Sequence, residues 1–284
     1  CMLRFRAIWL LLTLFQSVAQ EERGRREVDK TPHPCRSQYE EAEIQSWVQQ
    51  HLEGVPGERR TPSLLLLLGG SGAGKGTFID RWRAAEHREQ EAKSRSISEF
   101  AFHGLDEYLQ YVPEYQQSIS DPEHVYKDAA DACYGGAAIP AAKAANDLII
   151  SRRIDTIYEE TGKNLDRIKN RVLPPFLDGG YRVTVVLVHN HADIAIERGK
   201  GRFQRTGRFA PEDYIRDTFK NGLESYKELK HMGLAAEFVY CANFESMQCW
   251  EDDGLVKDDD IVPSSLLEQG PARVREPQNA EGEL

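Results

Sequence analysis

A glycine-rich run with a single lysine is the stretch of this sequence whose residue types and spacing most clearly indicate chemistry. It follows five leucines and reads Gly69-Gly70-Ser71-Gly72-Ala73-Gly74-Lys75-Gly76-Thr77. Glycines let a loop curl with its backbone N–H groups pointing inward, and a helix that begins at the lysine adds partial positive charge. A strand, such a loop and a helix form a phosphate-binding P-loop, in which Lys75 reaches the β- and γ-phosphates of a nucleotide.

The position after the lysine departs from the usual P-loop, because it is Gly76 where a Ser or Thr normally binds Mg²⁺. The hydroxyl comes one residue later, at Thr77, about 100° further round a helix. This Gly-Lys-Gly-Thr order resembles adenylate kinase and its relatives. We therefore expect residues 70–77 to bind ATP. Thr77 is expected to contact a phosphate, while Mg²⁺ is held mainly by water, phosphates and a distant carboxylate.

Polar side chains follow two further stretches that read as strands, residues 97–103 and 154–158. They are Asp106 after the first stretch and Glu159, Glu160 and Thr161 after the second. Open α/β sheets bind ligands at the carboxyl ends of their strands. A carboxylate there can bind Mg²⁺ or accept the proton of an attacking hydroxyl. Asp106 is thus a candidate base and, with Thr77, a candidate metal ligand; the alternative is that Asp106 caps a helix N-terminus.

A basic cluster lies later in the chain, at Arg198, Lys200, Arg202, Arg205 and Arg208. On a helix, the arginines at 198, 202 and 205 share one face, because they are spaced i, i+4 and i+7. Two glycines, at 199 and 201, loosen that helix, as expected for a segment that moves. We expect these arginines to close over the phosphates as a lid, with Arg198 and Arg202 in catalysis and Arg205 and Arg208 on the nucleotide. A solvated surface helix is the alternative.

These side chains need a sheet that brings strand ends together. Five apolar runs of strand length, separated by helical patterns, supply it: residues 64–68, 97–103, 154–158, 181–188 and 236–241. The alternation predicts an α/β P-loop NTPase fold, with a five-stranded, mainly parallel sheet flanked by helices on both faces and an arginine lid. Helices are expected from residue 37, after the P-loop, and over 137–152, 165–177 and 211–231. Residues 113–136 are expected to form a mobile insertion.

The two ends of the chain differ in composition from this domain. Residues 1–19 combine a basic start, an apolar stretch and small residues, which predicts a signal peptide; a buried N-terminal helix is the alternative. The apolar stretch is too short for a comfortable membrane span. We expect a linker over 20–37, the kinase domain over 38–250 and an acidic, partly disordered tail over 251–284. The signal peptide would direct the protein into the secretory pathway, and without it the protein would be cytoplasmic.

Charge, cysteines and histidines exclude some functions and leave others open. The formal net charge of −10 argues against general nucleic-acid binding. Five cysteines show no zinc spacing. Cys241 can pair with Cys249, and Cys35 with either of them, or these thiols stay unpaired. His189 and His191 follow the fourth predicted strand without an apparent third ligand, so we prefer a loop that lines the nucleotide base over a metal site.

Together these features resemble the zeta-toxin family of P-loop kinases over residues 60–250. The resemblance rests on the P-loop, Asp106 followed by Pro113-Glu114-Tyr115, and Glu159-Glu160-Thr161-Gly162, supported by Gly180-Tyr181 and residues 198–211. It implies an ATP- and Mg²⁺-dependent kinase that phosphorylates a hydroxyl of a small molecule, such as UDP-N-acetylglucosamine or another nucleotide sugar. It also implies roles for single residues: Asp106 as base, Glu159 or Glu160 with Thr161 as substrate ligands, and Arg198, Arg202 and Arg208 as lid contacts.

Two other functions remain open from the residues alone. A nucleoside-monophosphate or polynucleotide kinase would use the same donor site with a different acceptor. A non-catalytic, ATP-binding regulatory module would explain both Gly76 and the predicted signal peptide.

Overall fold

The structure is a computed structural model of the 284-residue chain. It describes residues 27–29, 35–88, 96–120, 124–126, 129–206, 210–244, 246–251 and 254–256. The predicted signal peptide, Arg208 and the part of the predicted tail beyond residue 256 lie outside the described residues. Arg205 is described only as part of a helical backbone.

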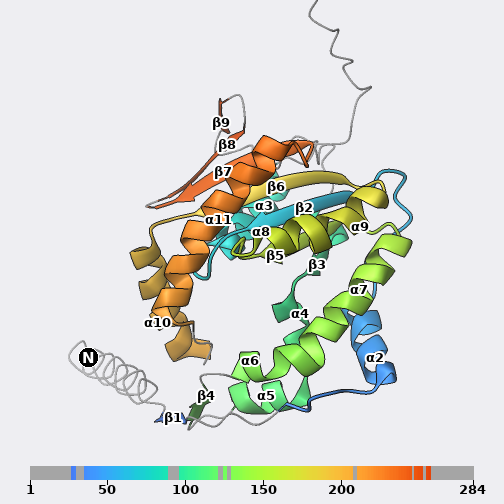
Figure 1. The fold of residues 1–284 in the computed structure, drawn as a ribbon, viewed down its shortest axis with the longest axis vertical. Coiled ribbons are helices and arrows are strands. Elements are labelled where there is room, and N and C mark those ends of the chain that lie inside the picture. Colours follow the sequence, from blue (N-terminus) through green and yellow to red (C-terminus); the bar gives the residue numbers. More distant parts are fainter. Residues whose placement is uncertain are drawn as a thin grey trace, which may run out of the picture.

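A seven-stranded sheet in the order β3-β5-β2-β6-β7-β8-β9 forms the centre of the fold (Figure 1). Its five parallel strands are the five expected from the sequence: β2 (Ser63–Leu68), β3 (Ala101–His103), β5 (Thr156–Glu160), β6 (Arg182–His189) and β7 (Glu237–Asn243). The central strand β2 lies between β5 and β6, so the strand order reverses beside it. The carboxyl ends next to such a reversal are where ligands bind in open α/β sheets.

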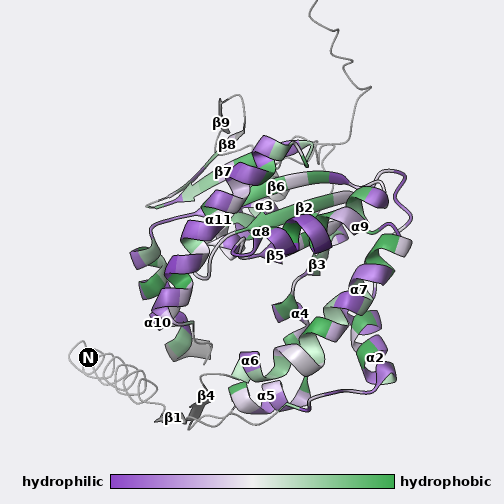
Figure 2. Cartoon of the chain, in the orientation of Figure 1, coloured by the Kyte–Doolittle hydropathy of each residue, from purple (hydrophilic) through white to green (hydrophobic). Residues whose placement is uncertain are grey.

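Helices cover both faces of the sheet because successive side chains of a strand point to opposite faces. On β2, Leu64, Leu66 and Leu68 belong to one buried cluster, and Leu65 and Leu67 belong to the other. All five leucines are fully buried, which explains their unbroken apolar run. Figure 2 shows the contrast between the mostly green central strands and the purple segments along the outer helices.

The helices take the places that the sequence patterns predict. Those that begin near their expected positions are α2 (Glu41–His51), α3 (Lys75–Arg88), α7 (Ile139–Ser151), α10 (Ala192–Thr206) and α11 (Glu212–Met232). The expected helix over 165–177 is divided into α8 (Leu165–Arg167), the π-helix η3 (Ile168–Val172) and α9 (Leu173–Asp178). The apolar stripe of α2 is core packing as expected, since Ile44 and Val48 are buried where α2 meets α7.

The expectation of a mobile insertion over residues 113–136 is wrong. This stretch contains α5 (Pro113–Ser120), the short strand β4 (His124–Tyr126), α6 (Ala129–Cys133) and the start of the π-helix η2 (Tyr134–Ala138). With α4 (Leu105–Leu109) these helices form a group beside α2 and α7 (Figure 1). The pair Gly135-Gly136 ends the segment that was expected to be mobile, but both glycines belong to η2.

Three further regions differ from the structure that the sequence predicts. A 3₁₀ turn, η1 (Ile97–Glu99), replaces the first half of the expected second strand. The strands β8 (Met247–Glu251) and β9 (Gly254–Val256) extend the sheet with antiparallel pairing, so the sheet continues past residue 250. A short strand β1 (Glu27–Asp29) pairs with β4 inside the expected linker.

Two disulfides are present in the described part of the chain, one between neighbouring strands and one between distant segments. Cys241 and Cys249 are direct partners in the β7–β8 ladder, as the sequence allowed. Cys35 does not pair with either of them; it bonds to Cys133, 98 residues away. Within the described part of the chain, no helix combines the length and apolarity needed to cross a membrane.

Candidate active site

The glycine loop connects β2 to α3, as a P-loop must, and α3 begins at Lys75. Gly74 has φ +106°, and a Cβ there would lie 2.0 Å from Nδ2 of Asn243. The loop therefore needs glycine at this position for both its backbone conformation and its packing. The N-terminus of α3 points its first N–H groups at the loop, which is a favourable position for an anion.

Two asparagines hold the loop from outside. Asn190, after β6, donates from Nδ2 to the carbonyl oxygens of Gly72 and Ala73 over 3.2 and 3.4 Å. Asn243, at the end of β7, donates to Ala73 over 2.9 Å. With these carbonyls engaged, the loop is fixed in one curl before any nucleotide binds, which lowers the ordering cost of binding.

One large cavity, of about 1470 Å³, lies over the carboxyl ends of the parallel strands. Its lining includes the expected nucleotide-binding residues Gly70, Ser71, Gly72, Gly74, Lys75, Gly76 and Thr77, whereas Ala73 is buried behind them. It also includes the other candidates Asp106, Glu159, Glu160, Thr161, Arg198 and Arg202. The structure thus brings together residues that lie more than a hundred positions apart in the sequence.

Lys75 lies between the P-loop and a carboxylate. Its Nζ donates to the carbonyl oxygen of Gly69 over 2.8 Å and is 4.0 Å from Oε2 of Glu159. Glu160, the other carboxylate of this pair, forms an ion pair with Arg167 instead. The two neighbouring glutamates therefore have different surroundings: one faces the lysine of the P-loop, and the other is neutralised by an arginine.

Asp106 follows β3 and lies in the first turn of α4. The cap position of this helix is Gly104, so Asp106 is not the N-cap. Its side chain is exposed to the cavity, where Oδ1 accepts a hydrogen bond of 2.6 Å from the hydroxyl of Tyr134. Burial, followed by the nearby charge of Glu159, raises the pKa of the adjacent Glu107. Glu107 lines the cavity too, so several carboxylates face it.

The helix α10 brings its arginines to the P-loop. Arg202 donates from Nη2 to Oγ of Ser71 over 2.7 Å, and Arg198 donates from Nη1 to the carbonyl oxygen of Gly72 over 3.4 Å. Burial lowers the pKa of the Arg202 guanidinium, while the side chain of Arg198 remains exposed. Arg198 and Arg202, the i and i+4 positions of the basic face predicted for this helix, thus point toward the phosphate-binding loop.

The residues present fit a nucleotide with Mg²⁺. Lys75, Arg198 and Arg202 offer positive charge around a glycine loop too tight for side chains at Gly72 and Gly74. Among the described side chains, no group of three or more His, Cys, Asp or Glu residues is arranged to hold a metal. Mg²⁺ binds through one or two carboxylates plus substrate phosphates and keeps several waters. His191 instead stacks on Phe244, with ring centroids 4.6 Å apart.

Sequence reasoning missed several residues of this site. They are Tyr115 and Tyr134 in the cavity lining, Arg167 beside Glu160, and Asn190 and Asn243 behind the P-loop. Asn190 stands directly between the two histidines that the sequence singled out, so its place at a strand end was available as a signal. Nothing in the sequence around Tyr134 points to a contact with Asp106.

Comparisons with known proteins agree with this architecture. A sequence profile described as Zeta toxin matches residues 48–254. A solved structure from work on the PezAT chromosomal toxin–antitoxin system of Streptococcus pneumoniae is 18% identical, with a TM-score of 0.54 over 72% of this chain and 78% of that one. A chain of the Pnkp1/Rnl/Hen1 RNA repair complex is 14% identical, with a TM-score of 0.41 over 60% of this chain and 47% of that one.

No curated protein matches this sequence. The family profile, however, covers well over half of the chain and spans every candidate residue of the cavity. The fold, the P-loop and the profile lead to the same conclusion: this chain has a P-loop kinase fold and belongs to the Zeta toxin family.

Proposed function

We propose that this protein is an ATP-dependent kinase that transfers the γ-phosphoryl group of ATP to a hydroxyl of a small molecule. One observation carries the proposal: Lys75 and Asp106 line the same cavity, over which Arg198 and Arg202 reach the P-loop. A lysine at the donor phosphates, a carboxylate for the acceptor and arginines for the transferred charge are the parts that phosphoryl transfer requires.

Each of these side chains has a distinct part in the reaction. The loop amides and Lys75 bind and orient the donor phosphates. Asp106 orients the acceptor hydroxyl and receives its proton. Arg198 and Arg202 neutralise the charge that spreads over the transferred group, which contributes roughly 10³–10⁵ in rate in related systems. ATP would supply the phosphoryl group, and Thr77 and the cavity carboxylates would hold Mg²⁺, which would neutralise phosphate charge.

The acceptor is proposed to be a nucleotide sugar, with UDP-N-acetylglucosamine as the first candidate. The cavity is large enough for two substrates, since its volume of about 1470 Å³ exceeds the roughly 300–1,000 Å³ of common ligand pockets. Glu159, Glu160 and Thr161 would hold the acceptor on the side of Asp106. Lys163 also lines the cavity, and its positive charge suits an acceptor that carries phosphates.

The experiment is a transfer assay with radiolabelled γ-phosphate and a panel of nucleotide sugars, nucleotides and polyols. We expect one acceptor class to become labelled by the wild type. Asp106→Asn should retain ATP binding by calorimetry and lose transfer, because the amide cannot accept the hydroxyl proton. Equal labelling by the wild type and Asp106→Asn across the panel would refute the proposed role of Asp106.

The two disulfides support a location in the secretory pathway. Such bonds persist in oxidising compartments and are rare in the cytosol. The structure joins Cys35 to Cys133 and Cys241 to Cys249. Mass spectrometry of the protein isolated from cells under thiol-blocking conditions should find these four cysteines unmodified by the blocking reagent; four alkylated cysteines would contradict this location.

A further inference from the structure

The proposed function assigns no role to Tyr134, although this residue lies beside Asp106 in the cavity. It lies in the cavity wall at the start of η2, and its hydroxyl donates to Oδ1 of Asp106 over 2.6 Å. Asp106 lies in the first turn of α4, with its side chain exposed to the cavity. The hydrogen bond favours the rotamer that directs Oδ1 toward Tyr134. Burial raises the pKa of the Tyr134 phenol, so the phenol stays a donor.

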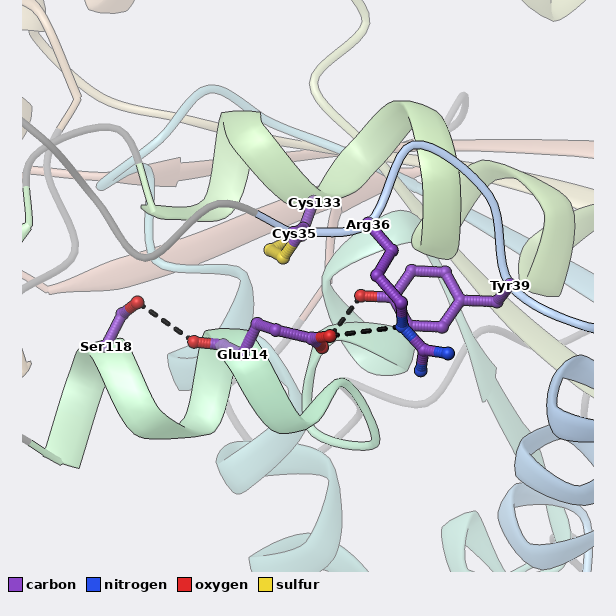
Figure 3. The surroundings of a disulfide bond; sticks show 6 residues. All are labelled: Cys35, Arg36, Tyr39, Glu114, Ser118 and Cys133. Carbon is purple, nitrogen blue, oxygen red and sulfur yellow. Dashed lines mark hydrogen bonds and ion pairs between the residues drawn. A yellow bond between two sulfur atoms is a disulfide. The ribbon is translucent and has the colours of Figure 1, made fainter.

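Cys133, the residue directly before Tyr134, is joined by a disulfide to a segment that precedes α2. Cys133 forms a disulfide with Cys35, which begins an extended segment, residues 35–40, that we name the N-terminal strap. Figure 3 shows the two sulfur atoms between the strap and the helix that carries Cys133. Because Cys133 is the last residue of α6 and Tyr134 the first of η2, the bond fixes the backbone that sets the direction of the phenol.

The strap also packs closely against η2 beyond the disulfide. A Cβ at Gly136 would lie 2.2 Å from the carbonyl oxygen of Arg36 and 2.9 Å from the backbone of Ser37. Only glycine allows this approach, and it occurs within the π-helix that Tyr134 begins. π-Helical turns are uncommon and are often found at functional sites. Two separate contacts, one covalent and one steric, therefore hold η2 to the strap.

A polar cluster anchors the strap to α5 (Figure 3). Arg36 donates from Nε to Oε1 of Glu114 over 3.1 Å, and Tyr39 donates to Oε2 of the same carboxylate over 2.8 Å. The guanidinium of Arg36 lies 4.0 Å from the ring centroid of Tyr39 and also pairs with Glu43 of α2. The strap is thus tied to α2, α5 and η2, three elements around the Asp106 side of the cavity.

We propose that Tyr134 is a positioning residue that fixes the carboxylate of Asp106 for transfer, and that the Cys35–Cys133 disulfide holds Tyr134 in place. This inference rests on the proposed kinase function, because a positioned base matters only if a hydroxyl is deprotonated there. It makes activity depend on a bond far from the P-loop in sequence. The oxidised protein is the active form, and the form with two thiols is the impaired one.

Reduction of the strap is a balanced two-electron step. A dithiol attacks the Cys35–Cys133 bond, the S–S bond breaks, and the two protein sulfurs end as thiols with the two protons of the reagent. The reagent closes to its own cyclic disulfide. In the reduced state, the contacts of Arg36 and Tyr39 with Glu114 keep the strap on α5, while η2 loses its covalent link to the strap.

The first test compares Tyr134→Phe with Tyr181→Phe. Tyr181 also loses one hydrogen bond, the 2.9 Å bond from its hydroxyl to the carbonyl oxygen of Ile149, but it is outside the cavity lining. We expect Tyr134→Phe to lower kcat about tenfold, equivalent to about 1.4 kcal/mol of barrier. The KM and the calorimetric Kd for ATP should stay within about twofold, and Tyr181→Phe should keep wild-type kcat. A wild-type kcat in Tyr134→Phe overturns the inference.

The second test compares the double variants Cys35→Ala/Cys133→Ala and Cys241→Ala/Cys249→Ala. The first pair should reproduce the kcat loss of Tyr134→Phe and become insensitive to added dithiothreitol, whereas the second pair should keep wild-type kcat and its sensitivity. Gly136→Ala, which displaces the strap without changing a cysteine, should lower kcat in the same way. Equal kcat and equal dithiothreitol response in the two cysteine pairs would overturn the role of the strap.

A spectroscopic measurement separates this inference from the proposed function. The ¹³Cγ signal of Asp106, identified by its absence in Asp106→Asn, should shift in Tyr134→Phe and, in the same direction, in Cys35→Ala/Cys133→Ala. It should not shift in Tyr181→Phe or Cys241→Ala/Cys249→Ala. If the wild type phosphorylates no acceptor, the proposed function fails while this signal still decides the positioning. An Asp106 signal that is identical in all variants overturns the positioning itself.

Discussion

Arg202 of α10 donates a hydrogen bond from Nη2 to Oγ of Ser71 in the P-loop, over 2.7 Å. The two residues lie 131 positions apart, so the contact is made by the fold and not by local sequence. It places a half-buried cation on the loop where phosphates are expected, beside Tyr115 and Tyr134 of the opposite wall. The arginine segment therefore contacts the P-loop directly.

Removal of this cation should affect the rate of transfer more than nucleotide binding. Arg202→Ala is expected to lower kcat roughly 10³-fold, because the negative charge on the transferred phosphoryl group then lacks the guanidinium that stabilises it. Arg202→Lys should recover only part of the rate, since an ammonium lacks the planar guanidinium fork. Steady-state kinetics test this, with Arg171→Ala as control, because Arg171 is exposed on η3. Equal losses in the Arg202 and Arg171 variants would contradict the role.

Lys75 should be needed for nucleotide binding itself. Saturating ATP is expected to raise the melting temperature of the wild type, since a ligand at 100 times its Kd stabilises the folded state by about 2.7 kcal/mol. Lys75→Ala should lose most of this stabilisation and all measurable transfer. Lys143→Ala, at an exposed position of α7, should behave as the wild type. A full ATP-induced shift in Lys75→Ala would show that the nucleotide binds elsewhere.

The two glycines that flank Lys75 should differ sharply in their tolerance of a side chain. A Cβ at Gly76 meets no atom within 4 Å, whereas one at Gly74 would lie 2.0 Å from Asn243, with φ at +106°. Gly76→Ser should keep the free energy of unfolding within about 0.5 kcal/mol. Gly74→Ala should lose more than about 1 kcal/mol and abolish ATP-dependent stabilisation. Urea titrations with and without ATP measure both; equal behaviour of the two variants would contradict the loop geometry.

Much of this fold could be predicted from the sequence, for a physical reason. The five parallel strands are buried on both faces, so each appears as an apolar run such as Leu64 to Leu68. The P-loop glycines and Lys75 have fixed spacing, and carboxyl ends of parallel strands meet at one edge of the sheet. The placement of Asp106 and Glu159 in one cavity with Lys75 follows from those facts alone.

The remaining features depend on contacts between distant residues, which no local pattern encodes. The Cys35–Cys133 bond spans 98 positions, and the sequence suggested other partners for Cys35. Gly136 ends the segment that was expected to be mobile, but its missing side chain admits the carbonyl of Arg36 within a π-helix. The strand β9 lies in a stretch whose acidic residues suggested a tail. In each case tertiary packing outweighed composition.

The buried His103 should make stability depend on pH. Its Nδ1 is 2.7 Å from the Tyr108 hydroxyl, and burial, with smaller effects of His51 and Arg167, lowers its pKa to about 3. The unfolded chain takes up a proton near pH 6.5, and the folded chain does not. The stabilising contribution of neutral His103 to the free energy of unfolding is therefore complete above pH 6.5 and is lost as pH falls toward 3. The loss between pH 7 and 5 is about 2 kcal/mol from this group.

Urea unfolding at several pH values measures this dependence. His103→Asn should show a flatter profile between pH 7 and 5, even though it is less stable at pH 7. His231→Asn, at an exposed position near the end of α11, should retain the wild-type slope. His51 contributes in the same direction, because burial also lowers its pKa, so the slope should not vanish entirely. A wild-type slope in His103→Asn would contradict this assignment.

The central claim is that the P-loop and Asp106 together move a phosphoryl group from ATP to a small hydroxyl compound. The most direct measurement is mass spectrometry of a cellular metabolite extract incubated with the protein and ATP labelled with ¹⁸O in its γ-phosphate. The account predicts a metabolite that gains the labelled phosphoryl group with the wild type and does not gain it with Asp106→Asn or Lys75→Ala. Label recovered only in free phosphate, at the same rate with wild type and Asp106→Asn, would contradict it.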